Sequence, residues 1–519
     1  MLTLNVPDID DSGRQHKAET RLKATTEWLA RLPFASPVDT AQQLITALYA
    51  LNRQPLDAVT RQSLLTLYRP VVSRVAANLE TLLAEAGVPP HAQQRQTGIL
   101  MRELLIEYAI GYKHVLLALT APDAGRTTPK QLAEIAARLL AALRDIRVAS
   151  YVTNKKPPEG LWLEKHQIYQ LAVTTGLADK AMGDAAPASL AYRQALLLAL
   201  ADPPHMSRGE LAHARQFLEG FGALAMLREA AAQPEQHGFT IPTDSDRGPA
   251  QPGVDARGSD LLLDTEALCR HLHEAIIRLR TGDSPRRVGL PHGMESELSL
   301  RVGKKLLKQW RSGAERAFKR YPVPDRVVQV VAGVSAIHRL LVQAAEVATD
   351  ADDSLPIGDV EMLYAAPAAI HASRWTIRND SAAGLALAGT PDTPLNLKVG
   401  DPLALRADDD TAMWSLAVIR WIVMHDAGRV ELGVERMAPH MQPVWVRRLR
   451  GLRKATEPAL FVPGLAALKQ PDRLLLPRHV YEPGMDAEIW HDPRQYTLTF
   501  GRRLEHTPSF DLIDFTLFV

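Results

Sequence analysis

The sequence predicts a multidomain α+β protein, in which an all-α N-terminal domain is followed by two small β domains. Helical periodicity dominates residues 18–232, and a stretch rich in Gly, Pro and Asp interrupts it near residues 235–260. Short strand-like runs with Gly turns dominate beyond Pro324. The length of 519 residues also exceeds that of a typical single domain.

Composition and charge exclude several classes of protein. Lys plus Arg number 60 and Asp plus Glu number 59, so net charge gives no reason to expect a DNA or RNA partner. No run of about 18 apolar residues predicts a membrane span. The single cysteine, Cys269, excludes an intrachain disulfide framework and a multi-cysteine metal site. The first residues lack the apolar run of a signal peptide, and we expect a cytoplasmic protein.

The N-terminal helical domain is expected over residues 1–234. Its segment "SPVDTAQQLITALYALN" begins with Ser36, a good helix cap, and with Pro37 at the first helical position. Residues 235–310 are expected to form a linker and connecting helices. The segment "EQHGFTIPTDSDRGPAQPGVDARGSD" has linker composition, and "DTEALCRHLHEAIIRLR" returns to the helical period.

Two β domains are expected to follow. "RVVQVVAG" is rich in β-branched residues, "SRWTIRNDSAAGLALAG" has two apolar runs around a polar turn, and "WSLAVIRWIVMHDAGRVELGVERM" reads as a hairpin. Such short strands favour a small barrel or sandwich. Similar runs in "RLLLP", "QYTLTF" and "FDLIDFTLF" predict a C-terminal β domain over residues 455–519. The basic run "RRLRGLRK" before it is interpreted as a linker, and the alternative is a segment that closes over a bound anion.

Two motifs could carry binding chemistry. The first, Arg316 and Arg320, lies four residues apart where the helical pattern gives way to a strand pattern. An arginine fork donates two parallel hydrogen bonds to a phosphate or to the edge of guanine. The second is "NDSAAG", in which Asn379 and Ser381 supply short polar groups from a turn. Gly384 would allow either a positive φ or the close approach of another backbone.

In this order, ahead of a β hairpin, the two motifs resemble those of the PilZ domain, a six-stranded antiparallel β-barrel that binds the bacterial second messenger cyclic di-GMP. The resemblance covers about residues 311–440 and includes "VGDPLAL", "VIRW" and "VELGVERM" as later strands. The two motifs are separated by more chain than is usual, so we expect an insertion with a helix and an acidic loop at about residues 338–372.

By this resemblance, Arg316 and Arg320 would grip phosphate and guanine. Asn379 would read a guanine edge, and Ser381 would contact the phosphate or the base, in a turn completed by Gly384. Glu315 precedes the first arginine and would repel a phosphate. Its presence leaves open whether one cyclic di-GMP or an intercalated pair binds.

The resemblance implies a bacterial cyclic di-GMP effector that has no other cofactor and no metal. A ligand-ordered arginine loop would reposition the domains and so control an unknown protein partner, contacted through the helical domain. The alternative is a PilZ-like scaffold that binds no ligand and acts through protein contacts. We expect no enzyme: "RVGKK" lacks the first glycine of a phosphate-binding loop, and "AGVSAIH" lacks the second glycine of a nucleophile elbow.

Overall fold

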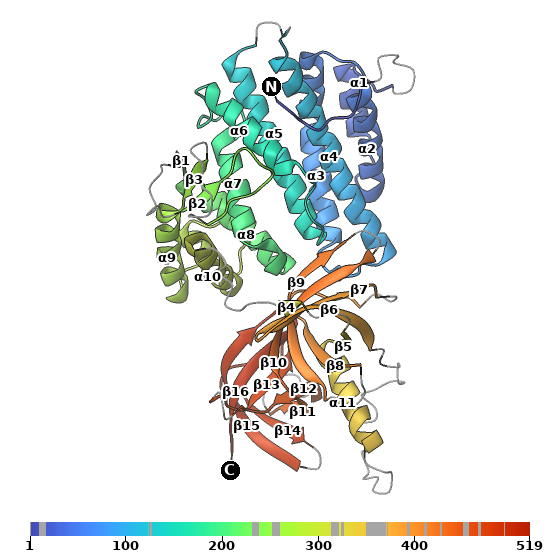
Figure 1. Ribbon diagram of the computed structural model, residues 1–519, viewed down its shortest axis with the longest axis vertical. Coiled ribbons are helices and arrows are strands. Elements are labelled where there is room, and N and C mark those ends of the chain that lie inside the picture. Colours follow the sequence, from blue (N-terminus) through green and yellow to red (C-terminus); the bar gives the residue numbers. More distant parts are fainter. Residues whose placement is uncertain are drawn as a thin grey trace. The chain divides into compact units, whose positions relative to one another are not determined.

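The computed structural model describes residues 2–518 apart from several short segments and one longer one. Not described are residues 10–16, 123, 125–126, 231–237, 252–259, 313–320, 323–325, 349–369, 371, 392–394, 409–412, 426–427, 450–455, 466–468 and 492–493. The chain forms two compact units, which are shown in Figure 1 and described separately below. Met1–Ala86 and Pro90–Glu315 make the helical unit, and Gly87–Pro89 and Arg316–Val519 make the double-barrel unit.

The helical unit contains ten described α-helices. They are α1 (Leu22–Ala30), α2 (Pro37–Arg53), α3 (Ala58–Leu82), α4 (Ala92–Thr120), α5 (Pro129–Val152), α6 (Leu161–Thr174), α7 (Ala188–Leu200), α8 (Arg208–Phe221), α9 (Glu266–Arg280) and α10 (Ser296–Ser312). The predicted start of α2 is confirmed, because Ser36 Oγ accepts a hydrogen bond from the Asp39 amide and Pro37 is the first helical residue. None of the described helices is long and apolar enough to cross a membrane.

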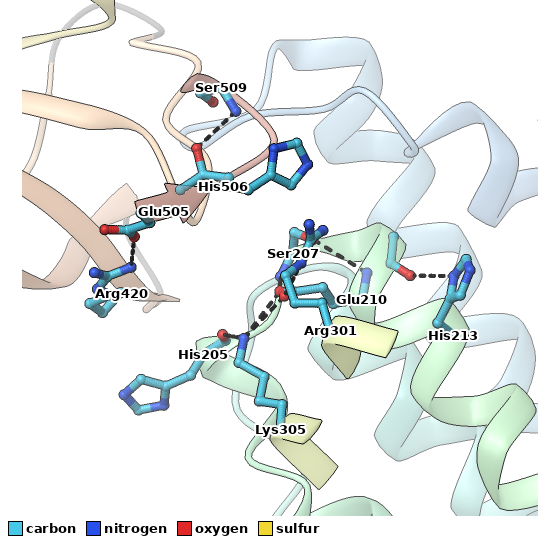
Figure 2. Close-up of polar contacts among 12 residues, drawn as sticks. His205, Ser207, Glu210, His213, Arg301, Lys305, Arg420, Glu505, His506 and Ser509 are labelled. Carbon is cyan, nitrogen blue, oxygen red and sulfur yellow. Dashed lines mark hydrogen bonds and ion pairs between the residues drawn. The ribbon is translucent and has the colours of Figure 1, made fainter. Parts of the chain in front are cut away.

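The connecting helices α9 and α10 pack onto the same core as the N-terminal helices. Leu272 of α9 and Trp310 of α10 are fully buried in it, and the Trp310 indole donates to the Leu197 carbonyl of α7. On the surface of α10, Lys305 Nζ lies 3.2 Å from a carboxylate oxygen of Glu210, which belongs to α8 (Figure 2). At least one basic residue of α10 therefore forms an ion pair within the helical unit.

A small antiparallel sheet completes this unit, with strand order β1-β3-β2. Its strands are β1 (Met226–Glu229), β2 (Phe239–Ile241) and β3 (Leu261–Asp264). Phe239 and Ile241 are buried in the helical core, so this part of the Gly- and Pro-rich stretch packs as structure rather than as a linker. Asp246 in the same stretch accepts hydrogen bonds from the Gly160 and Trp162 amides at the start of α6.

The double-barrel unit begins with the predicted six-stranded antiparallel barrel. Its strands are β5 (Val327–Ala332), β6 (Ser373–Ser381), β7 (Gly384–Gly389), β8 (Pro402–Ala407), β9 (Ser415–Met424) and β10 (Val430–Ala438). The order β6-β5-β8-β9-β10-β7 closes through pairing of β6 with β7, and the two-residue β4 (Tyr321–Pro322) adds to β6. The helix expected in the insertion is α11 (Val334–Ala348), whereas the acidic loop lies outside the described residues.

The C-terminal β domain is a second closed antiparallel barrel, with order β11-β12-β13-β16-β15-β14. Its strands are β11 (Gln442–Arg448), β12 (Thr456–Val462), β13 (Arg473–Pro477), β14 (Asp486–His491), β15 (Arg494–His506) and β16 (Phe510–Leu517). Arg447 and Arg448 lie on β11, so the linker interpretation of their segment is wrong for these two residues. The Arg447 guanidinium pairs with Glu488 and lies over the Trp490 ring, which explains why an arginine suits this strand.

Besides the core of each barrel, a third hydrophobic core contains residues of both barrels and of α11. Ile337 of α11, Leu416 of β9 and Phe510 of β16 are all completely buried in it. A polar contact adds to this packing, because Arg420 Nη1 lies 2.6 Å from Glu505 Oε1 of the second barrel (Figure 2). The barrels therefore form one packed body rather than two independently tethered domains.

Candidate ligand-binding site

The second motif forms the tight turn between β6 and β7. Ser381 Oγ donates to the Gly384 carbonyl at 3.0 Å and accepts from the Gly384 amide at 3.2 Å. One hydroxyl thus closes the turn from both sides, which is a common use of serine beside a glycine. Ser381 is only partly buried. Its oxygen has one further lone pair with which it can accept a hydrogen bond.

Gly384 is required by the close approach of another backbone. A Cβ at this position would lie 2.0 Å from the Val434 carbonyl oxygen of β10. Its φ is not among the positive values found in this chain. Of the two reasons that the sequence offered for a glycine, the structure therefore supports close approach and not a left-handed backbone.

The register of β4 on β6 links the two motifs. Tyr321 lies opposite Asp380, and Pro322 lies opposite Asn379. Arg320 immediately precedes Tyr321 in the chain, although Arg316 and Arg320 themselves lie outside the described residues. Two segments almost 60 residues apart in sequence are thus joined by strand pairing, and the residue after the arginine motif lies beside the turn motif.

A further arginine, Arg436 of β10, holds the same turn. Arg436 Nη1 lies 2.9 Å from Asp380 Oδ1 and also donates to the Ser381 carbonyl, while the Arg436 amide donates to the Ala383 carbonyl. The negative charge of the Asp380 carboxylate next to the turn is therefore paired with a positive one. Sequence reasoning missed this contact because Asp380 and Arg436 are 56 residues apart, and only the pairing of β7 with β10 brings them together.

An exposed aromatic residue lies at the same place. Tyr321 is 64% exposed, which is high for a tyrosine at a strand position. Its ring is available for stacking on a flat ligand, and its place after Arg320 is the one signal in the sequence that could have drawn attention to it. Among the described residues, no group of three or more His, Cys, Asp and Glu side chains is arranged to hold a metal ion.

Three family models match successive parts of the chain. One described as "Cyclic-di-GMP receptor FimW, N-terminal domain" matches residues 23–233, one described as "Cyclic-di-GMP receptor FimW, middle PilZ domain" matches 364–443, and one described as "FimW C-terminal beta-barrel domain" matches 444–518. The cyclic-di-GMP receptor FimW of Pseudomonas aeruginosa is 26% identical over 94% of this chain and 89% of its own length. The middle match includes the turn motif and begins after Arg320.

Proposed function

We propose that this chain is a cyclic di-GMP receptor, because its residues 364–443 match a PilZ domain model, with a helical domain before them and a second barrel after them. The receptor name of its Pseudomonas aeruginosa relative supports this proposal. The observation that carries it is the pairing of β4 with β6, since this register brings the chain next to Arg320 against Asn379, just before the turn.

The residue types suit a dianionic guanine nucleotide. Arg316 and Arg320 would supply planar forks for phosphate oxygens and for the O6 and N7 edge of guanine. The Asn379 amide, on β6, would donate to and accept from the base edge. The Ser381 hydroxyl makes two hydrogen bonds within the turn. Its remaining lone pair would accept a hydrogen bond from the ligand.

Two residues beyond the sequence motifs extend this site. Arg436 compensates the charge of Asp380, which would otherwise repel the ligand's phosphates. Tyr321 would stack on an exposed base face, a contact worth about 1 to 3 kcal/mol per base in nucleic-acid complexes. Both residues lie on strands that pair with the hairpin of the turn motif, so strand pairing places their backbones beside the turn.

We propose further that the receptor acts by controlling a protein partner. The arginine segment lies in the chain between α10 of the helical unit and β5 of the first barrel, so a ligand that fixes this segment would also restrict how the two units move. Because the two barrels share a core, the second barrel would move together with the first. The helical unit would then present its partner surface in a ligand-dependent way.

Calorimetric titration of the full chain with cyclic di-GMP tests the proposal. Saturable binding is expected for the wild type, and Arg320→Ala and Asn379→Ala should each weaken it. The matched control is Arg374→Ala, which removes a 70% exposed arginine side chain from the far end of β6. No binding by the folded wild type would instead favour the alternative, a PilZ-like scaffold that acts only through protein contacts.

A further inference from the structure

The first residues of the chain lie as an extended arm on the helical unit. We define the arm as residues 2–9, which contain no helix or strand. Its backbone is bound by side chains: the Thr3 amide donates to Gln167 Oε1 at 2.8 Å, and the Asn5 amide donates to Glu164 Oε1 at 2.7 Å. Lys113 Nζ donates to the Asn5 carbonyl at 3.2 Å. The arm is thus held as an extended peptide is held by a receptor.

Two of the groups that bind the arm are buried charges. Lys113 and Glu164 are 7% and 5% exposed, and Lys113 Nζ lies 2.6 Å from Glu164 Oε1. Burying such a pair is costly unless the remaining donors and acceptors are satisfied. Here the Asn5 amide donates to Glu164 Oε1 and the Asn5 carbonyl accepts from Lys113, so one backbone residue contacts both charges. Because these are backbone groups, the same pair would accept any extended peptide.

The arm does not fill the groove in which it lies. A cavity of about 380 Å³ is bounded on one side by Asn5, Val6 and Pro7 of the arm. Its other walls are formed by apolar residues, among them Ile106 and Ile110 of α4, and by charged residues such as Arg53. This volume falls within the range of small-ligand pockets. Of the arm's side chains, only Leu4 is buried. The groove can therefore take a larger apolar side chain than Val6.

We propose that this groove is a docking site for an extended segment of a partner protein, and that the arm occupies it in the partner's absence. The partner segment would carry apolar side chains two residues apart, at the places of Leu4 and Val6, with an aromatic residue at the second. Its backbone would take over the hydrogen bonds to Gln167, Glu164 and Lys113. The site lies wholly in the helical unit and shares no residue with the proposed nucleotide site.

A labelled peptide with the sequence of residues 2–9 tests the groove directly. In the wild type, the arm competes at the high effective concentration of an intramolecular ligand, so the free peptide should bind weakly. Leu4→Glu in the full chain should release the arm. Fluorescence polarisation should then show binding at least about tenfold tighter than to the wild type. A peptide carrying Val6→Trp should bind tighter still, because it fills the cavity.

Matched variants separate binding from folding. Added to the Leu4→Glu chain, Lys113→Met should abolish peptide binding, whereas Glu159→Gln, which changes a wall of the cavity that holds no arm backbone, should not. Where Leu4→Glu unfolds the helical unit, Asn5→Pro serves instead, because it removes the amide bound by Glu164 from an exposed residue.

Two results would overturn the proposal. One is the absence of peptide binding to an arm-released chain that keeps its helical circular dichroism and melting temperature. The other is a wild-type dimer in light scattering that dissociates on Leu4→Glu, since this would identify the arm of a second copy as the occupant.

Discussion

Replacing Gly384 by alanine should destabilise the double-barrel unit through a clash with a paired strand. The new Cβ would lie 2.0 Å from the Val434 carbonyl oxygen and 3.2 Å from Glu435 Cα. Both atoms belong to the backbone of β10, so no side chain can rotate away to make room. Overpacking of this kind costs about 1 to 3 kcal/mol, and we expect the upper end because a backbone must move. For a unit of about 200 residues, this lowers the melting temperature by about 6 to 12 °C.

Thermal unfolding followed by circular dichroism in the β region measures this effect. Ala382→Val is the control, since Ala382 lies in the same turn but is exposed, and its variant should melt as the wild type does. Gly384→Ala should also weaken cyclic di-GMP binding, because the turn that carries Ser381 is displaced. A melting temperature for Gly384→Ala within about 1 °C of the wild type would refute the close approach of β10.

Three further predictions concern single side chains. Arg320→Ala should cost about 2 to 5 kcal/mol of cyclic di-GMP affinity in calorimetry, and Arg320→Lys should not restore it, because an ammonium group cannot form a bidentate fork. Arg436→Met should cost about 1 kcal/mol of affinity, part of which Asp380→Asn should recover by removing the uncompensated charge. Burial against Trp445 lowers the pKa of His338 from 6.5 to about 4, because the folded protein favours the neutral ring. The stability that this preference gives is complete above about pH 6.5 and is lost as the pH falls towards 4. Urea unfolding should show that loss, about 3 kcal/mol, and His338→Gln should reduce it.

Local patterns predicted most of the elements. The polar turn in "NDSAAG" and the runs on either side of it gave the β6–β7 hairpin, and the β-branched run after Pro324 gave β5. The start of α2 followed from Ser36 and Pro37, since a cap and the first helical position are set by neighbouring residues. Such features depend on a few adjacent residues, so a single sequence contains them.

The remaining features depend on contacts between residues far apart in the sequence. The last residues of β11 are basic, so their composition indicated a linker rather than a strand. Arg447 suits this strand because Glu488 and Trp490 lie beside it on β14. The contact of Arg436 with Asp380 likewise depends on the register of β10, which no local pattern encodes. The arm on α4 and α6 escaped prediction because its partners are side chains more than 100 residues away.

The most direct test of the central claim, that the arginine motif and the turn motif form one cyclic di-GMP site, is hydrogen exchange with and without the ligand. The pairing of β4 with β6 predicts that amide exchange slows both in residues 313–325 and around Asn379–Gly384 when cyclic di-GMP is added. Both effects should disappear in Arg320→Ala. Slower exchange confined to the helical unit, with both motifs unchanged, would place the ligand elsewhere and contradict the account.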